Sequence, residues 1–360
     1  MLIYLLYVSM PVLAWFAFTL FFGKPISSSE KMKKRYITFC GIVLFLIIAL
    51  RHYSVGSGDG EWYYMNWKYL SDVSFKQYLN IYGSIDIENG YLFSIWLISH
   101  VFKDPQFVFV FYGLLMAISV STFVYKNCED PVLAFVMFNC LGLWGFMVQG
   151  IRQGIAMCIC LFAIEACKQK KLIRFIFIVI LAMLFHASAV VFFAVYPLSK
   201  VKMDIKGYLI TIVVAVIASM SMDTIFSVIN TVIDDTYEIG DIDSSSGGLV
   251  SVAIYVIVLV ATLVFYSKDS DEDNNIQMFF YITLWGFIMF LMRYFANSIA
   301  QRAAYYYMFG QLVLLPSIIK NKLGREGALA GMLAVGLCVG IAVYKASYSV
   351  LVPYYFFWQA

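Results

Sequence analysis

The chain has 360 residues, of which 62% are hydrophobic and only 13% are charged, and its formal net charge is +3. Soluble domains are about half apolar and a quarter charged, so the composition excludes an ordinary soluble protein and indicates one transmembrane domain over residues 1–360. The seven cysteines lie mostly in apolar runs and form no disulfide pattern. Motifs for nucleotides or structural zinc are absent, so we expect no cofactor, no metal site and no nucleic-acid partner.

Apolar runs follow one another along the chain, and a spanning helix needs about 20 such residues. The first run has no basic leader and no cleavage site, so we interpret it as a retained helix. The pattern predicts an all-α polytopic integral membrane protein with about 10–12 transmembrane or re-entrant helices. An amphipathic tail, 347–360, follows and is expected at the membrane interface. The runs are 1–22, 36–50, 91–102, 106–125, 131–148, 151–167, 172–198, 208–222, 249–266, 276–292, 303–319 and 327–344.

Lysine and arginine gather in a few short connections between these runs. Such connections stay on the cytoplasmic side of a membrane. Residues 23–35, 168–174 and 200–206 are rich in both, and 320–326 is likewise predicted to be an inner basic loop. This distribution places the amino terminus outside.

With these loops inside, residues 51–90 form an outer loop and 223–248 form an outer acidic loop. Two departures from simple alternation are needed. The run 91–102 is too short to cross and is treated as a re-entrant or juxtamembrane helix. The run 172–198 is expected to begin and end inside, as two half-helices broken near His186. Broken helices at membrane depth are tolerated where they line a polar cavity.

Four arginines lie at or near the outer ends of the predicted helices. An ionisable group at membrane depth is costly and usually faces a cavity, and a guanidinium presents a rigid fork of donors that suits phosphate oxygens. Helix capping or snorkelling would explain any one of them alone. Together on one face they favour an outward-facing polar cavity for an anionic ligand. They are Arg51, Arg152, Arg293 and Arg302.

Other polar residues interrupt the apolar pattern on the same side. His186 is either bonded to a neighbouring carbonyl, or it acts as a proton carrier or as a hydrogen-bond donor that binds phosphate. Ser188 is a second donor or a hydroxyl that packs helices. Glu88 precedes a short helix, where capping of its amino terminus explains it adequately. Asp59 lies in a glycine-rich stretch followed by aromatic residues, which suit sugar rings or headgroups but are also ordinary at membrane interfaces.

Separated blocks of the sequence share one recognisable pattern. The blocks are Arg51–Asp59 with the later Glu88-Asn-Gly-Tyr, Ile151-Arg-Gln-Gly-Ile-Ala, Ala182-Met-Leu-Phe-His-Ala-Ser-Ala and Gln301-Arg-Ala-Ala-Tyr-Tyr-Tyr. Together they resemble the EpsG-like branch of the Wzy-type bacterial polysaccharide polymerases, over roughly residues 1–320. The Arg-Gln-Gly-Ile-Ala and Phe-His-x-Ser-Ala blocks are the most specific.

This resemblance implies a multi-pass membrane glycosyltransferase of the bacterial cytoplasmic (inner) membrane, with its site facing the periplasm or exterior. It would join oligosaccharide repeat units carried on undecaprenyl pyrophosphate into O-antigen, capsule or exopolysaccharide. Membrane lipid and a chain-length regulator are the other expected partners.

Such a transfer needs donors that stabilise the departing pyrophosphate and a general base for the acceptor hydroxyl. The base is Asp59, Glu88 or His186, and the sequence does not rank them. The catalytic candidates are Arg152, His186, Asp59 and Glu88. The substrate-binding candidates are Arg51, Gln153, Ser188, Arg293, Arg302 and Tyr305.

Three other functions fit parts of the pattern. A ligase that moves finished glycan to another acceptor also gathers arginines and a histidine on the outer face. A membrane O-acyltransferase carries a histidine in an apolar helix. A flippase or transporter of lipid-linked oligosaccharide should show polar groups along its whole depth, whereas here they gather towards one face.

Overall fold

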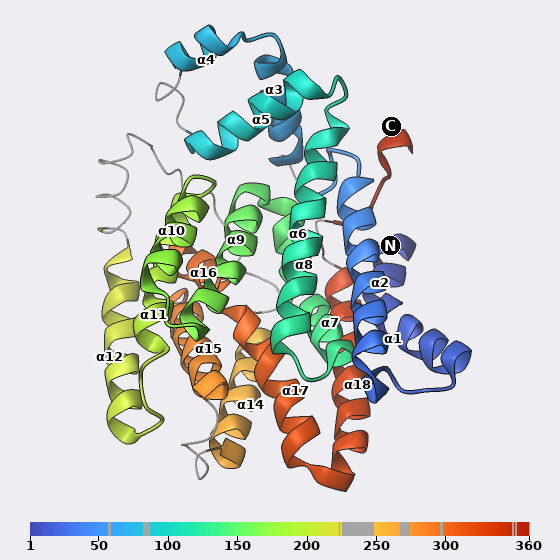
Figure 1. The fold of residues 1–360 in the computed structure, drawn as a ribbon, viewed down its shortest axis with the longest axis vertical. Helices are drawn as coiled ribbons and strands as arrows, with labels where there is room; N and C mark the ends of the chain where they lie inside the picture. The colour runs from blue at the N-terminus through green and yellow to red at the C-terminus, as the bar shows by residue number, and fades with distance from the viewer. Residues whose placement is uncertain are drawn as a thin grey trace.

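The computed structural model describes residues 1–56, 59–81, 87–222, 224, 248–266, 274–295, 298–347, 349 and 351–359. Within these ranges the regular structure is helical, and extended pairing is limited to one bridge between Arg51 and Phe356. The chain is an all-α, polytopic membrane protein, as predicted (Figure 1). The acidic loop expected over 223–248 lies outside the described residues, apart from Thr224 and Gly248.

Long helices form most of the bundle. Among the described residues, α1, α6, α14, α15 and α18 are long and apolar enough to cross a membrane. Helix α2 reaches the same length, but a cluster of charges fills its first two turns. The long helices are α1 (Leu2–Phe22), α2 (Glu30–Ala49), α6 (Gln106–Asn127), α9 (Ile151–Lys168), α12 (Ile205–Met220), α14 (Gly248–Tyr266), α15 (Asn274–Met292), α17 (Gln311–Lys322) and α18 (Gly327–Ala346).

Short or broken elements complete the bundle. The predicted run 131–148 is bent by 53° between α7 (Pro131–Cys140) and α8 (Leu143–Gln149). Gly142 at the bend has φ +79°, a left-handed conformation that glycine adopts without steric cost. The other short elements are η1 (Ile26–Ser28), α16 (Ser298–Ala304), η3 (Met308–Gly310), η4 (Gly324–Glu326) and η5 (Phe357–Gln359).

The run 172–198 forms a hairpin of α10 (Leu172–Met183), η2 (Ala187–Ala194) and α11 (Val195–Leu198). The Phe175 ring near its start lies 5.4 Å from the Tyr196 ring near its end. The Tyr196 hydroxyl donates to the Lys170 carbonyl at 3.2 Å. Both ends of the hairpin therefore lie at the same end of the bundle, and the predicted pair of half-helices with a break near His186 is confirmed.

Three helices cap one end of the bundle, drawn at the top of Figure 1. They are α3 (Asp59–Ser71), α4 (Phe75–Ile81) and α5 (Asn89–Val101), and we call these three helices the cap. The Trp96 indole donates to the Val73 carbonyl at 2.8 Å and fixes α5 to the connection between α3 and α4. The segment 51–90 thus contains helices that its polar, aromatic sequence did not predict.

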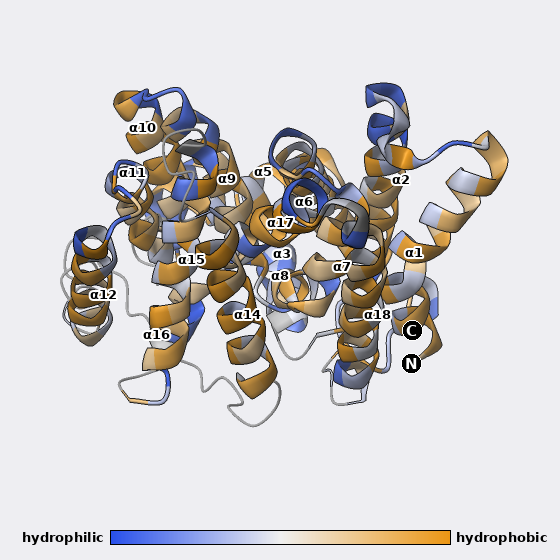
Figure 2. Ribbon diagram, turned by 90° about the horizontal axis from the view of Figure 1, so that it is seen from below, coloured by the Kyte–Doolittle hydropathy of each residue, from blue (hydrophilic) through white to orange (hydrophobic). Residues whose placement is uncertain are grey.

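The basic connections converge on the opposite end, which we call the basic end. Lys126 pairs with Glu165 at 3.1 Å, and Lys320 pairs with Glu129 at 2.8 Å. These contacts join the ends of α6, α9 and α17 near the start of α7. Figure 2 shows the helices largely hydrophobic along their length, with hydrophilic residues concentrated in connections and helix ends. Nζ of Lys34 lies 5.2 Å from the centre of the Tyr125 ring, and Lys168 and Lys200 line the same groove, so the four basic connections share a face, as predicted.

The carboxyl-terminal tail returns to the far end of α2. The Tyr354 hydroxyl donates to the Ile47 carbonyl at 2.6 Å. The backbone N–H of His52 donates to the Tyr355 carbonyl at 2.8 Å, and that of Phe357 donates to the Leu50 carbonyl at 2.9 Å. The first and last of these bonds satisfy the carbonyls of Ile47 and Leu50, which the end of α2 leaves without partners.

Candidate active site

Three charged or titratable side chains meet between the cap and the bundle. Glu88, which is 3% exposed, binds Arg152 through Oε2 at 2.5 Å and His186 Nδ1 through Oε1 at 2.5 Å. The backbone N–H of Ala187 also donates to Oε1, at 3.1 Å. We call Glu88, Arg152 and His186 the central cluster. Its members come from the position before α5, from α9 and from the hairpin, three separate parts of the chain.

Glu88 stands at the position before α5, but its side chain makes no capping hydrogen bond there. The expectation that helix capping explains this carboxylate is therefore wrong. Its carboxylate instead reaches the tip of the hairpin because α5 begins in direct contact with that tip. The Tyr91 N–H donates to the Leu184 carbonyl at 3.2 Å. A Cβ atom at Gly90 would lie 2.6 Å from Leu184, so the close approach requires glycine.

His186 lies at the break between α10 and η2, where the backbone is extended (φ −162°, ψ 120°). The break turns its ring out of the helical path towards Glu88. In the tautomer that carries its proton on Nδ1, the ring donates to Glu88 and presents Nε2 as an acceptor. A carboxylate on one ring nitrogen fixes both the tautomer and the orientation of a histidine.

Arg152 is the more accessible member of the cluster, with its side chain 29% exposed. Its guanidinium lies 5.0 Å from the centre of the Trp62 ring. That ring is 37% exposed and stacks on Tyr91 at 6.1 Å. Trp62 and Arg152 therefore offer an aromatic face and a cation side by side, above the buried Glu88 and His186.

The environment of Glu88 decides its protonation state. Burial alone would raise its pKa, but the hydrogen bond of His186 and the charge that this ring carries when protonated, together with the charge of Arg152, lower that pKa to about 2. Glu88 is therefore ionised throughout the physiological range. A general base works best when its pKa lies near the operating pH, so Glu88 is poorly suited to that role and well suited to orienting His186.

A second group of predicted residues adjoins the central cluster. The Gln153 side chain donates to the Arg302 carbonyl at 2.8 Å. The Ser188 hydroxyl lies 3.0 Å from the Tyr306 hydroxyl. Tyr305 stacks on Phe146, with ring centres 3.9 Å apart. Gln153 and Ser188 are close in sequence to Arg152 and His186, so this second group ties α9 and the hairpin to α16 and the turn after it.

The remaining arginines lie in two different places. The guanidinium groups of Arg293 and Arg302 both interact electrostatically with Tyr305. Arg51 is fully buried at the end of α2, where Nη1 donates to the carbonyls of Val55 at 2.9 Å and Val148 at 2.6 Å. Arg302 therefore lies next to Gln153, the neighbour of Arg152, and Arg293 lies near Tyr305, whereas the contacts of Arg51 favour a role in holding the backbone.

The side chain of one predicted residue lies outside the described residues, and two residues that contact the site were not predicted from the sequence. Asp59 begins α3, and its side chain lies outside the described residues. Tyr91 and Tyr306 were not singled out, although each belongs to a block quoted above. Sequence reasoning chose Tyr305 from the Tyr-Tyr-Tyr run, but it is Tyr306 that contacts Ser188.

Two grooves lie at the basic end rather than at the central cluster. One has a volume of about 660 Å³ and lies between α1 and α2. The other has a volume of about 540 Å³ and lies among the ends of α9, α11 and α15. Within the described ranges, groups of three or more histidine, cysteine, aspartate or glutamate side chains that could hold a metal ion are absent.

The fold and the central cluster define a multi-pass membrane protein with a charged site at the end of its bundle opposite the basic connections. The family model for the EpsG family matches residues 34–358, so the chain belongs to the EpsG family. Membership suggests a polysaccharide polymerase-like role in a bacterial membrane. No curated protein and no solved structure matches the chain.

Proposed function

We propose that this protein is a polysaccharide polymerase that works at the outer face of the bacterial cytoplasmic membrane. It joins oligosaccharide repeat units carried on undecaprenyl pyrophosphate into O-antigen, capsule or exopolysaccharide. Family membership supports the polymerase class. The observation that carries the proposal is the contact of Glu88 with both Arg152 and His186, because it combines a proton carrier with a phosphate-binding cation.

In the proposed transfer, a hydroxyl of one lipid-linked unit attacks the anomeric carbon of another. The new glycosidic bond forms as the bond to the pyrophosphate oxygen breaks, and the lipid pyrophosphate leaves with the electron pair. Nε2 of His186 accepts the hydroxyl proton, and Glu88 stabilises the imidazolium that results. His186 therefore ranks above Glu88 as the general base, while Asp59 stays a candidate.

In the proposed reaction the arginines stabilise the leaving pyrophosphate. A guanidinium has five N–H donors, and the hydrogen bond of Arg152 to Glu88 uses one of its two terminal nitrogens. The remaining donors are directed to the phosphate oxygens, which suit a guanidinium fork. Because Glu88 cancels the charge of Arg152, the net positive charge at the site comes from Arg293 and Arg302. No bound metal is required for this charge stabilisation.

The sugar next to the reacting bond is assigned to Trp62. An aromatic ring that is partly exposed and rigidly stacked offers a flat apolar face. This face lies beside the Arg152 guanidinium. A sugar ring on Trp62 would therefore place its hydroxyls close to the central cluster.

The experiment that tests this proposal is the surface glycan ladder of a bacterium that lacks the gene and is complemented with variants. Wild type should restore long chains, whereas Arg152→Ala and His186→Ala should leave a single repeat unit at normal protein abundance. Full chain length with Arg152→Ala would count heavily against the proposal. A normal ladder that lacks an acyl group would indicate an acyltransferase, and loss of even the single-unit band would indicate ligation or flipping.

A further inference from the structure

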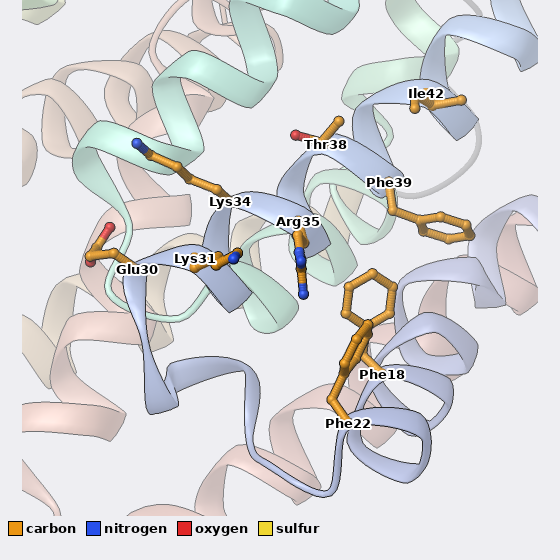
Figure 3. Close-up of a pocket in the computed structure, with 9 residues that line it drawn as sticks. All are labelled: Phe18, Phe22, Glu30, Lys31, Lys34, Arg35, Thr38, Phe39 and Ile42. Carbon is orange, nitrogen blue, oxygen red and sulfur yellow. The ribbon is translucent and has the colours of Figure 1, made fainter.

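A groove between α1 and α2 opens at the basic end of the bundle (Figure 3). Its volume is about 660 Å³. Lys31, Lys34 and Arg35 line one part of it, and Phe18, Phe39 and Ile42 line another. The groove therefore combines cations at the start of α2 with an apolar channel further along the same helix.

The groove has the length of one leaflet of a bilayer. Lys31 and Ile42 are about three helical turns apart, which is a rise of about 16 Å. Half of a typical hydrocarbon core is about 15 Å thick. A ligand that begins at Lys31 and ends near Ile42 would therefore extend from the headgroup level to the middle of the membrane.

Two of the three cations of the groove lie near aromatic rings. The guanidinium of Arg35 lies 5.4 Å from the centre of the Phe22 ring, and Nζ of Lys34 lies 5.2 Å from that of Tyr125. Among the described residues, the ion pairs at the basic end involve Lys126, Lys168 and Lys320 and none of the groove cations. Glu30 is the one carboxylate that lines the groove, so its mouth keeps a positive charge.

The apolar walls come from two helices that face each other. The rings of Phe18 and Phe39 are 5.9 Å apart across the groove, and Phe18 lies 5.6 Å from Phe22. Ile42 is 51% exposed although it belongs to a helix of the bundle. Figure 3 shows Phe18 and Phe22 on α1, and Phe39, Arg35 and Ile42 on α2. Such a wall is suited to an acyl chain.

We propose that this groove binds one anionic phospholipid. Its phosphate lies between Lys31 and Arg35, where the guanidinium fork matches the phosphate oxygens. One acyl chain lies along Phe18, Phe39 and Ile42. A soluble anion would contact only the cations of the groove, and a neutral lipid would contact only its apolar walls. An anionic phospholipid contacts both. The site is independent of the central cluster and of the proposed polymerase activity.

The test is lipid binding to the purified full-length protein, measured by native mass spectrometry after detergent delipidation and titration. Phosphatidylglycerol should bind in preference to phosphatidylcholine. Each cation near a membrane surface strengthens anionic-lipid binding about fivefold, so Lys31→Ala with Arg35→Ala should weaken phosphatidylglycerol binding about thirtyfold. The matched control is Lys206→Ala with Lys320→Ala, which removes the same charge elsewhere and should leave binding unchanged.

A second variant tests the apolar part alone. Thr38 is exposed and lines the groove, so Thr38→Trp should fill the channel and reduce phosphatidylglycerol binding without any change of charge. Unaltered binding in this variant would overturn the proposed site. Equal weakening by the control pair would do the same, because it would show diffuse attraction to surface charge. Displacement of phosphatidylglycerol by a smaller amount of undecaprenyl phosphate would reassign the groove to the lipid carrier and refute the phospholipid.

Discussion

Glu88→Gln is the sharpest perturbation of the central cluster. The substitution keeps the shape of the side chain but removes the charge that faces Arg152 and His186. The fall in the pKa of Glu88 from 4.5 to about 2 corresponds to a stabilisation of about 3 kcal/mol at neutral pH. Removal of one partner from a buried ion pair costs about 3–5 kcal/mol. The pKa shift and the loss of a buried partner therefore both predict that Glu88→Gln lowers the free energy of unfolding by about 3 kcal/mol.

The pH dependence of this loss has a definite sign. Glu88 has a lower pKa in the folded protein, so its contribution is fully present above about pH 4.5 and disappears as the pH falls through about 2. The stability difference between wild type and Glu88→Gln should therefore stay constant from pH 8 to pH 5 and shrink below that range. Thermal unfolding of the detergent-purified proteins, followed by tryptophan fluorescence, measures it.

The loss of polymerase activity should be larger than the loss of stability alone would cause. Because the neutral amide cannot stabilise the imidazolium of His186 by charge, polymerisation should drop at least about a hundredfold, measured as chain extension of lipid-linked repeat units at a temperature where the variant is folded. Asp72→Asn makes the same chemical change at an exposed position of the cap and serves as the control. Wild-type stability together with wild-type chain length in Glu88→Gln would refute the reasoning.

The other predictions concern the neighbours of Glu88. His186→Asn should abolish chain extension yet keep binding of the lipid-linked donor, measured by pull-down with a labelled analogue. Arg152→Lys keeps the charge but loses the planar fork, so donor binding should weaken about tenfold in the same pull-down. Trp62→Ala should raise the acceptor concentration needed for half-maximal extension, and Trp62→Phe should restore most of the difference. Gly90→Ala should destabilise the protein by about 1–3 kcal/mol in thermal unfolding, because its Cβ collides with Leu184.

The bundle could be predicted from the sequence because apolar run length is a local signal. Helices α6, α9, α15 and α18 follow the predicted runs closely. The hairpin could also be predicted, since the basic connections at both of its ends had to share a face. The helices of the cap could not be predicted in this way, because their sequence is polar and aromatic. They are stabilised by packing against one another, as the contact of Trp96 with Val73 shows.

The site could be predicted only in part. Sequence reasoning named Glu88, Arg152 and His186 separately, but it could not pair them, since Glu88 lies 64 residues from Arg152 and 98 from His186. For the same reason Glu88 was explained as a helix cap, the local role of a carboxylate in that position. The contacts of Arg51 also depend on residues distant in sequence, among them Val148.

The return of the carboxyl-terminal tail to α2 has a consequence for biogenesis. The cap and the far end of α2 emerge early during synthesis, whereas Tyr354, Tyr355 and Phe357 emerge only after α18. The carbonyls of Ile47 and Leu50 therefore have no donors from the tail until the helices up to α18 have been made. The segment that leads from α2 into the cap is therefore fixed only after α18 has been made, so a chain halted before the tail would leave this segment without its bonds to Tyr354, Tyr355 and Phe357.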